Sequence, residues 1–161
     1  MCGIAGYFNP DQNYAENPKQ NFHTLSRMIN TMNHRGPDTY GHTIINSCCL
    51  AHTRLSIIDL ENGRQPMSYT KDGNTYYIVY NGEIYNYKEV KKTLLRKNYT
   101  FETNSDTEVI IAAFCHYGPG FVKELNGIFA IAIYDSMRNT LYLYRDRFGV
   151  KPLYYTKTGD T

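Results

Sequence analysis

Met1-Cys2-Gly3-Ile4-Ala5-Gly6-Tyr7-Phe8 opens the chain, and it places a cysteine directly after the initiator methionine. If Met1 is removed, Cys2 carries a thiol, with a reference pKa of about 8.5, and a free α-amino group, with a reference pKa of about 7.7 to 8.0. A nucleophile and a base then lie within hydrogen-bond reach of each other without a distant histidine. The apolar run that follows predicts a strand over residues 3 to 9, with Cys2 at its end.

Length and composition limit the class of protein. A chain of 161 residues fits one domain of ordinary size. The 17 basic and 15 acidic side chains give a net charge of +2 with no long run of either sign, which argues against a nucleic-acid partner. No apolar run approaches the roughly 20 residues of a membrane helix, and the N-terminus lacks the order of a secretory signal. We therefore expect a cytoplasmic protein with no membrane partner.

The cysteines and histidines do not predict a metal site. The four cysteines form no C-x-x-C pair, and the five histidines include no pair spaced four apart. Cys48 and Cys49 are adjacent, so in a strand they would point to opposite faces, and we expect at least one of them to fill core space.

The first half of the chain reads as one helix and several strands. Helical spacing of apolar residues, beginning at Phe22, predicts a helix over about residues 22 to 33. Alternation from Thr43 to Ile58 predicts two strands around a corner near Asn46-Ser47. Residues 59 to 75 read as a loop that ends in a hairpin turn, followed by a strand over residues 76 to 80. We expect Asn81-Gly82-Glu83 to form a turn at the end of that strand, with free backbone N–H groups.

The second half contains a clear helix start. Ser105 and Glu108 form a capping-box pattern, which predicts a helix that runs to Gly118, and Asn86 is expected to cap a helix from Tyr87 to about Lys97. Strands are predicted over residues 127 to 134, 141 to 145 and 153 to 156. Arg145-Asp146-Arg147 reads as a structural ion-pair group. Together these elements indicate an α+β domain with antiparallel sheets covered by helices.

The polar residues at the expected strand ends have the chemistry needed to hydrolyse the amide of an amino-acid substrate. The thiolate of Cys2 attacks a carbonyl, and its α-amine moves the proton. Asn81 and the neighbouring backbone N–H group can stabilise the oxyanion. Arg54 can bind an α-carboxylate through two parallel hydrogen bonds, and Asp106 can pair with an α-ammonium group.

The whole chain resembles the glutamine-hydrolysing domain of class II glutamine amidotransferases, and within them that of glutamine-dependent asparagine synthetases. Each matching motif is weak by itself, but their order and spacing over nearly all of the chain are specific. The motifs are Met1-Cys2-Gly3-Ile4-Ala5-Gly6, His34-Arg35-Gly36-Pro37-Asp38, Ala51-His52-Thr53-Arg54-Leu55-Ser56-Ile57-Ile58-Asp59, Gln65-Pro66-Met67, Tyr80-Asn81-Gly82-Glu83-Ile84-Tyr85-Asn86, Ser105-Asp106-Thr107-Glu108, Leu125-Asn126-Gly127 and Arg145-Asp146-Arg147.

The resemblance implies an N-terminal-nucleophile fold, a four-layer αββα sandwich of two antiparallel sheets between helical layers. It assigns Cys2 as the nucleophile, and Asn81 with Gly82 as the oxyanion hole. It also implies that the following residues bind glutamine: Arg54 at the carboxylate, Asp106 and Glu83 at the amino end, and backbone of Leu55, Ser56, Ile57 and Ile58 along the pocket. Arg35 is expected to shape the wall beside the nucleophile.

Residues 1–161 are therefore expected to be one glutamine amidotransferase type-2 domain. The family's C-terminal synthetase domain, in which a Ser-Gly-Gly-x-Asp-Ser loop binds ATP and aspartate is adenylated, is absent from this chain. We expect either the glutaminase half of a larger enzyme or a protein that delivers ammonia to a partner. No cofactor is expected in this domain, and ATP with magnesium is expected for the synthetase domain alone.

Three functions remain open at this point. The first is a glutaminase that supplies ammonia for asparagine synthesis. The second is the glutaminase of a related amidotransferase that amidates another carboxylate. The third is a non-catalytic module that binds glutamine, which would apply if Met1 stays in place and blocks the α-amine of Cys2.

Overall fold

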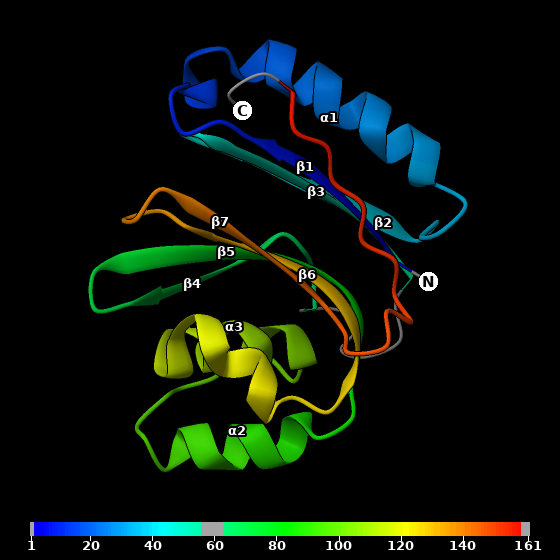
Figure 1. The fold of residues 1–161 in the computed structure, drawn as a ribbon. Helices are drawn as coiled ribbons and strands as arrows, with labels where there is room; N and C mark the ends of the chain where they lie inside the picture. Colours follow the sequence, from blue (N-terminus) through cyan, green and yellow to red (C-terminus); the bar gives the residue numbers. More distant parts are fainter. Residues whose placement is uncertain (1, 56–62, 159–161) are drawn as a thin grey trace.

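The protein is a sandwich of two antiparallel sheets between helices, and the computed structural model describes residues 2–55 and 63–158 (Figure 1). From one side to the other the layers are α1, a three-stranded sheet, a four-stranded sheet, and α3 with α2 outside it. This arrangement confirms the α+β fold class and the layer order that the resemblance implied.

The three-stranded sheet carries the N-terminus. Its strands are β1 (Gly3–Phe8), β3 (Cys48–Arg54) and β2 (Thr39–Ile45), in the order β1-β3-β2, and α1 (Pro18–Met32) covers its outer face. Leu25 and Ile29 of α1 pack on Cys49 and Ala51 of β3. Because β1 pairs with β3 from Gly3 opposite Thr53 onward, Cys2 is brought beside the end of β3.

The four-stranded sheet carries the largest part of the core. Its strands are β4 (Met67–Lys71), β5 (Asn74–Ile84), β6 (Gly127–Asp135) and β7 (Thr140–Arg145), paired in that order. On its outer face lie α3 (Asp106–Tyr117) and, further out, α2 (Tyr87–Leu95). Short 3-10 helices span Tyr14–Glu16 and Gly118–Glu124. α3 is buried through most of its length, since sheet and helix enclose it from both sides.

A second apolar layer lies between the two sheets. Cys48 and Leu50 of β3 meet Val79 of β5 and Tyr134 of β6 there. Cys49, one residue along, belongs to the layer under α1 instead. Both cysteines are free and buried, so the prediction that adjacent cysteines fill core on opposite faces is confirmed.

Several predicted boundaries of the first helix and of the strands were wrong. The first helix starts at Pro18, four residues earlier than expected, since proline is favourable in the first turn. Phe22 is 42% exposed and contacts the ring of His42, so it does not belong to the buried face. The segment read as a loop before the hairpin contains β4, whose pairing with β5 makes it a strand.

The helix caps differ in detail from the predicted patterns. Ser105 caps α3 as expected, because its side chain accepts from the Thr107 N–H at 3.1 Å. Glu108 does not return to Ser105; its carboxylate accepts from the N–H groups of Glu102 and Thr103 and so holds the preceding loop. Asn86 precedes α2, but its side chain binds the backbone of Glu124 and Asn126 rather than capping the helix.

Two predictions near the C-terminus were also wrong. Residues 153 to 156 form no strand and run past β1 (Figure 1). Tyr154 and Tyr155 are 90% and 83% exposed, so the apolar residues there have no sheet face to pack on. The second wrong prediction is the ion-pair group at Arg145-Asp146-Arg147. The carboxylate of Asp146 accepts from backbone N–H groups, including those of Val150 and Lys151, and it forms no ion pair in the described part of the chain.

Candidate active site

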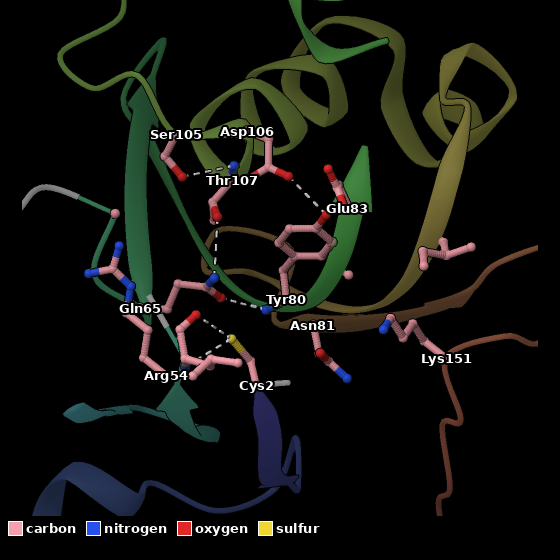
Figure 2. Close-up of a pocket in the computed structure, with 14 residues that line it drawn as sticks. Cys2, Arg54, Gln65, Tyr80, Asn81, Glu83, Ser105, Asp106, Thr107 and Lys151 are labelled. Carbon is pink, nitrogen blue, oxygen red and sulfur yellow. Dashed lines mark hydrogen bonds between the residues drawn. The ribbon is translucent and has the colours of Figure 1, made fainter. Parts of the chain in front are cut away.

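A cavity of about 140 Å³ lies where the ends of β1 and β3 meet β5 and the first turn of α3 (Figure 2). Sites for drug-sized ligands occupy roughly 300 to 1,000 Å³, so this cavity suits a small ligand. Its lining includes every described residue that was predicted to react or to bind glutamine: Cys2, Arg54, Leu55, Asn81, Gly82, Glu83 and Asp106. The predicted residues Ser56, Ile57 and Ile58 lie outside the described residues.

Cys2 is held by backbone contacts on two sides. Its Sγ donates to the carbonyl oxygen of Leu55 at 3.7 Å and accepts from the Leu55 N–H at 3.4 Å. Arg35 Nε donates to the Cys2 carbonyl oxygen at 3.1 Å, in agreement with the expected position of Arg35 beside the nucleophile. Cys2 is a partly exposed residue that lines the cavity, so a ligand in the cavity lies next to it.

Asn81 and Gly82 lie inside a strand, which corrects the prediction of a turn. They pair with Ala130 and Phe129 of β6, because β5 continues to Ile84. Asn-Gly is a turn signal only where the chain is free to reverse, and here strand pairing keeps it extended. Gly82 is required by close approach, since a Cβ at this position would collide with the backbone oxygen of Ile128.

Successive side chains of β5 leave the strand on opposite faces, as strand geometry requires. In Figure 2 the ring of Tyr80 points toward Asp106, whereas the amide of Asn81 points to the other side, where Cys2 lies. The strand therefore divides the site: one face carries the amide group near the nucleophile, and the other meets the carboxylate of α3.

The backbone of β5 also presents an N–H group to the cavity. Tyr80 N–H is bound by the side chain of Gln65 at 2.6 Å and Ile84 N–H by Asp106 Oδ2 at 3.4 Å, so these even-numbered residues turn their N–H groups away from β6. Gly82 lies between them, two residues from each, so its N–H group points to the same edge of the strand. Phe129, its partner on β6, is bonded to Asp146 instead: its N–H donates to the Asp146 carboxylate, and its carbonyl oxygen accepts from the Asp146 N–H. The Gly82 N–H thus faces the open edge of the strand.

Asp106 is a buried carboxylate at the other end of the cavity, only 6% exposed. The Tyr80 hydroxyl donates to its Oδ2 at 2.9 Å. Burial raises the pKa of Asp106 above its ordinary value, and the hydrogen bonds from Tyr80 and Ile84 oppose that rise. Burial and the neighbouring carboxylate raise the pKa of Tyr80, so its hydroxyl stays protonated as a donor.

Arg54 and Glu83 add charges at the rim. Arg54 is 6% exposed at the end of β3, which makes it a buried cation beside the cavity. Glu83 is exposed on β5. Opposite charges at separate points of one small cavity fit a ligand that carries both an ammonium and a carboxylate group.

Besides Ser105, which was predicted as a helix cap, the cavity has four polar lining residues with no role predicted from the sequence: Gln65, Tyr80, Thr107 and Lys151. Gln65, Tyr80 and Thr107 stand inside quoted motifs, but their residue types pointed to no specific chemistry. Lys151 follows a glycine-containing turn far along the chain and gives no local signal. These four residues meet at the cavity because the fold brings their separate segments together.

Residues 2–55 and 63–158 contain no group of three or more His, Cys, Asp or Glu side chains that could hold a metal ion. Among the helices described, none is long and apolar enough to cross a membrane.

Comparison with known proteins gives a match over the full length. The family model described as "Glutamine amidotransferase domain" matches residues 1–161. "Asparagine synthetase [glutamine-hydrolyzing] 3" of Bacillus subtilis is 42% identical over 161 residues, which is 100% of this chain and 26% of the relative. "Asparagine synthetase B [glutamine-hydrolyzing]" of Escherichia coli is 40% identical over 154 residues, 96% of this chain and 26% of the relative.

A relative with a different description also aligns. "Amidase chyE" of Penicillium rubens is 38% identical over 163 residues, 97% of this chain and 24% of the relative. Among solved structures, glutamine phosphoribosylpyrophosphate amidotransferase of B. subtilis shares the fold, with a TM-score of 0.58 and 22% identity over 73% of this chain and 27% of that one. The chain thus spans about a quarter of the length of these curated relatives.

Proposed function

We propose that this chain, which belongs to the glutamine amidotransferase domain family, hydrolyses L-glutamine to glutamate and ammonia through a thioester on Cys2. The observation that carries the proposal is the shared cavity. It combines the thiol of Cys2, the open edge of β5 at Gly82 and the buried carboxylate of Asp106 in a volume suited to one amino acid.

The first half of the reaction forms the thioester. Once Met1 is removed, the free α-amine of Cys2 takes the thiol proton and the sulfur attacks the γ-carbonyl carbon of glutamine. The Leu55 N–H that already donates to Sγ favours negative charge on the sulfur. Asn81 and the Gly82 N–H stabilise the oxyanion, and the amide nitrogen leaves as ammonia with the proton from the α-ammonium group.

The second half releases glutamate. A water molecule gives a proton to the α-amine and attacks the thioester carbonyl, and the same two donors stabilise the second oxyanion. The C–S bond then breaks, and the thiol regains its proton. Neither half of the proposed reaction uses a cofactor.

The substrate's charged end fixes its orientation. Asp106 and Glu83 bind the α-ammonium group, and Arg54 binds the α-carboxylate. Backbone of Leu55 lines the pocket beside them, and the predicted contribution of Ser56, Ile57 and Ile58 stays a prediction.

The ammonia is proposed to serve asparagine synthesis in a synthetase domain, which would use ATP and magnesium. The support is the 40 to 42% identity to two glutamine-hydrolysing asparagine synthetases, of which this chain matches only a quarter. The similarity to "Amidase chyE" favours a second candidate, in which the ammonia amidates another carboxylate. A cytoplasmic location is part of the same proposal.

The proposal is tested with the purified chain. Mass spectrometry first establishes whether Cys2 is the N-terminal residue, and glutamate and ammonia released from glutamine are then measured. We expect equal amounts of both products and loss of at least about 10³-fold in rate for Cys2→Ala. If Cys2→Ala keeps its rate, the thioester on Cys2 is ruled out. If Met1 is retained and the protein binds glutamine without turnover, the non-catalytic binding module is the correct reading.

A further inference from the structure

We propose that Gln65 is a positioning residue that sets the direction of the Gly82 N–H in the oxyanion hole. The inference rests on the proposed function and concerns a residue to which the sequence assigned no role. It starts from the uncovered edge of β5. Pairing with β4 ends at Ile78, opposite Met67, whereas β5 continues on its other side to Ile84, opposite Gly127.

The side chain of Gln65 takes the place of the missing strand. It lies just before β4 and, at 2.6 Å, its Oε1 accepts from Tyr80 N–H, the first backbone donor beyond the end of β4 pairing on this edge. The next donors on the same edge are Gly82 and Ile84. Since Asp106 binds Ile84, the Gly82 N–H is held between two anchors supplied by side chains.

The second contact of Gln65 ties this strand to α3. Its Nε2 donates to Thr107 Oγ1 at 3.2 Å, and Thr107 follows Asp106 in the first turn of that helix (Figure 2). One side chain therefore connects the strand that carries the oxyanion donors with the helix end that carries the substrate-binding carboxylate. The distance between these two parts of the site has to match the length of the substrate.

Gln65 lines the cavity, but the geometry favours positioning over substrate contact. Both ends of its amide are already bonded to the protein, Oε1 to Tyr80 and Nε2 to Thr107. Because both ends of the Gln65 amide are bonded to the protein, we expect it to influence the reaction through the strand that it holds. Its loss should affect the transition state, in which the oxyanion forms, more than the binding of glutamine.

The kinetic test uses Gln65→Met, which keeps the shape and removes both hydrogen bonds. We expect kcat for glutamine hydrolysis to fall about tenfold or more while KM changes less than about threefold, because a misplaced oxyanion donor costs part of the 10²- to 10³-fold lost with a deleted one. Gln20→Met makes the same change at an exposed position of α1 and should retain wild-type kinetics. A rise in KM with unchanged kcat would show substrate contact and overturn the proposal.

A second pair of variants addresses the link to α3. Thr107→Val removes the acceptor of Gln65 Nε2 but leaves the bond to Tyr80, so we expect a smaller loss in kcat than for Gln65→Met. Thr107→Ser keeps the hydroxyl and should retain more of kcat than Thr107→Val. Equal kcat for these two variants argues against the link, and the pair remains informative if Gln65→Met does not fold.

Amide hydrogen exchange separates this inference from the proposed function, because it needs no reaction. In Gln65→Met we expect the Tyr80 amide to exchange at least about tenfold faster than in the wild type, with the amides of β6 unchanged. Unchanged exchange at Tyr80 would overturn the inference. If the wild-type chain releases no ammonia from glutamine, the proposed function fails, and exchange still decides whether Gln65 holds β5.

Discussion

Asp106 shows how a single residue is adapted to its position. A buried carboxylate is costly unless it is hydrogen-bonded, and Asp106 has the Tyr80 hydroxyl and the Ile84 N–H as donors. Burial still raises its pKa. An α-ammonium ligand would stabilise the ionised form of this carboxylate. The two donors to Asp106 named above are both uncharged, so the ligand would supply a positive charge that they do not.

Replacing Asp106 with Asn should raise the KM for glutamine about tenfold or more, since a hydrogen bond to a charged group contributes roughly 1.5 to 3 kcal/mol. In the wild type, KM should also rise as the pH falls through the raised pKa of Asp106, because the protonated carboxyl no longer attracts the ammonium group. The measurement is KM as a function of pH for both proteins. Asp72→Asn, in an exposed hairpin turn, is the matched control.

A rise in KM toward acid pH that is equally steep in Asp106→Asn would contradict this assignment. The acid dependence would then belong to another group, and the ammonium end of the substrate would lie elsewhere in the cavity.

At the level of elements, β5 is the strand on which the site depends. It pairs with β6 along nine residues, and β6 comes so close that position 82 has no room for a side chain. The first turn of α3, fixed by the Ser105 cap, meets the opposite face of β5. Strand and helix thus hold two functional groups on either side of one backbone.

Gly82→Ala should destabilise the protein by about 1 to 3 kcal/mol, because the new methyl group meets the Ile128 carbonyl and lies 2.8 Å from the Phe129 Cα. For a chain of this size that corresponds to a fall in Tm of roughly 3 to 10 °C. Glutaminase activity should fall further than stability explains, since the Gly82 N–H moves with the strand. Thermal unfolding and kcat are measured on the same preparations.

Gly120→Ala is the control for this change, because a Cβ at position 120 meets no atom within 4 Å. Its Tm should stay within about 1 °C of the wild-type value. Equal effects of the two substitutions would show that the close approach of β5 and β6 does not limit position 82.

At the level of the whole molecule, His52 joins the two halves of the sandwich. It lies on the same face of β3 as Cys48 and Leu50, which face the second sheet, and it is 1% exposed. Within the described residues, neither ring nitrogen makes a well-formed hydrogen bond. Burial lowers the pKa of His52 to about 4, and the nearby Tyr80 backbone opposes this only in part.

The free energy of unfolding should therefore fall as the pH drops from about 6.5 to about 4, because the unfolded chain binds a proton that the folded chain excludes. The loss attributable to His52 is on the order of 3 kcal/mol over that range. His52→Leu should remove this part of the slope, as measured by urea unfolding at several pH values. His23→Leu, exposed on α1, should leave the slope unchanged; a His52→Leu slope equal to that of the wild type would contradict the prediction.

Most of the helices and strands, and the chemical types of the site residues, were predictable from sequence. Local patterns were sufficient for β1, for β6 and for the start of α3 at Ser105, because each depends on apolar spacing or a cap within a few residues. The motif order also gave the family, and the full-length family match confirms that identification. The roles of single residues in glutamine hydrolysis stay predictions.

Contacts between segments far apart in the chain depend on the tertiary structure and could not be read from local sequence. Asn81-Gly82 is part of a strand because β6, more than 40 residues away, pairs with it. Residues 153 to 156 form no strand, because they pair with none of the strands described. Gln65 gained a position between Tyr80 and Thr107 that no spacing indicates. Local sequence fixes the backbone preference and the chemistry of each side chain, whereas which groups meet depends on packing free energies summed over the whole sandwich.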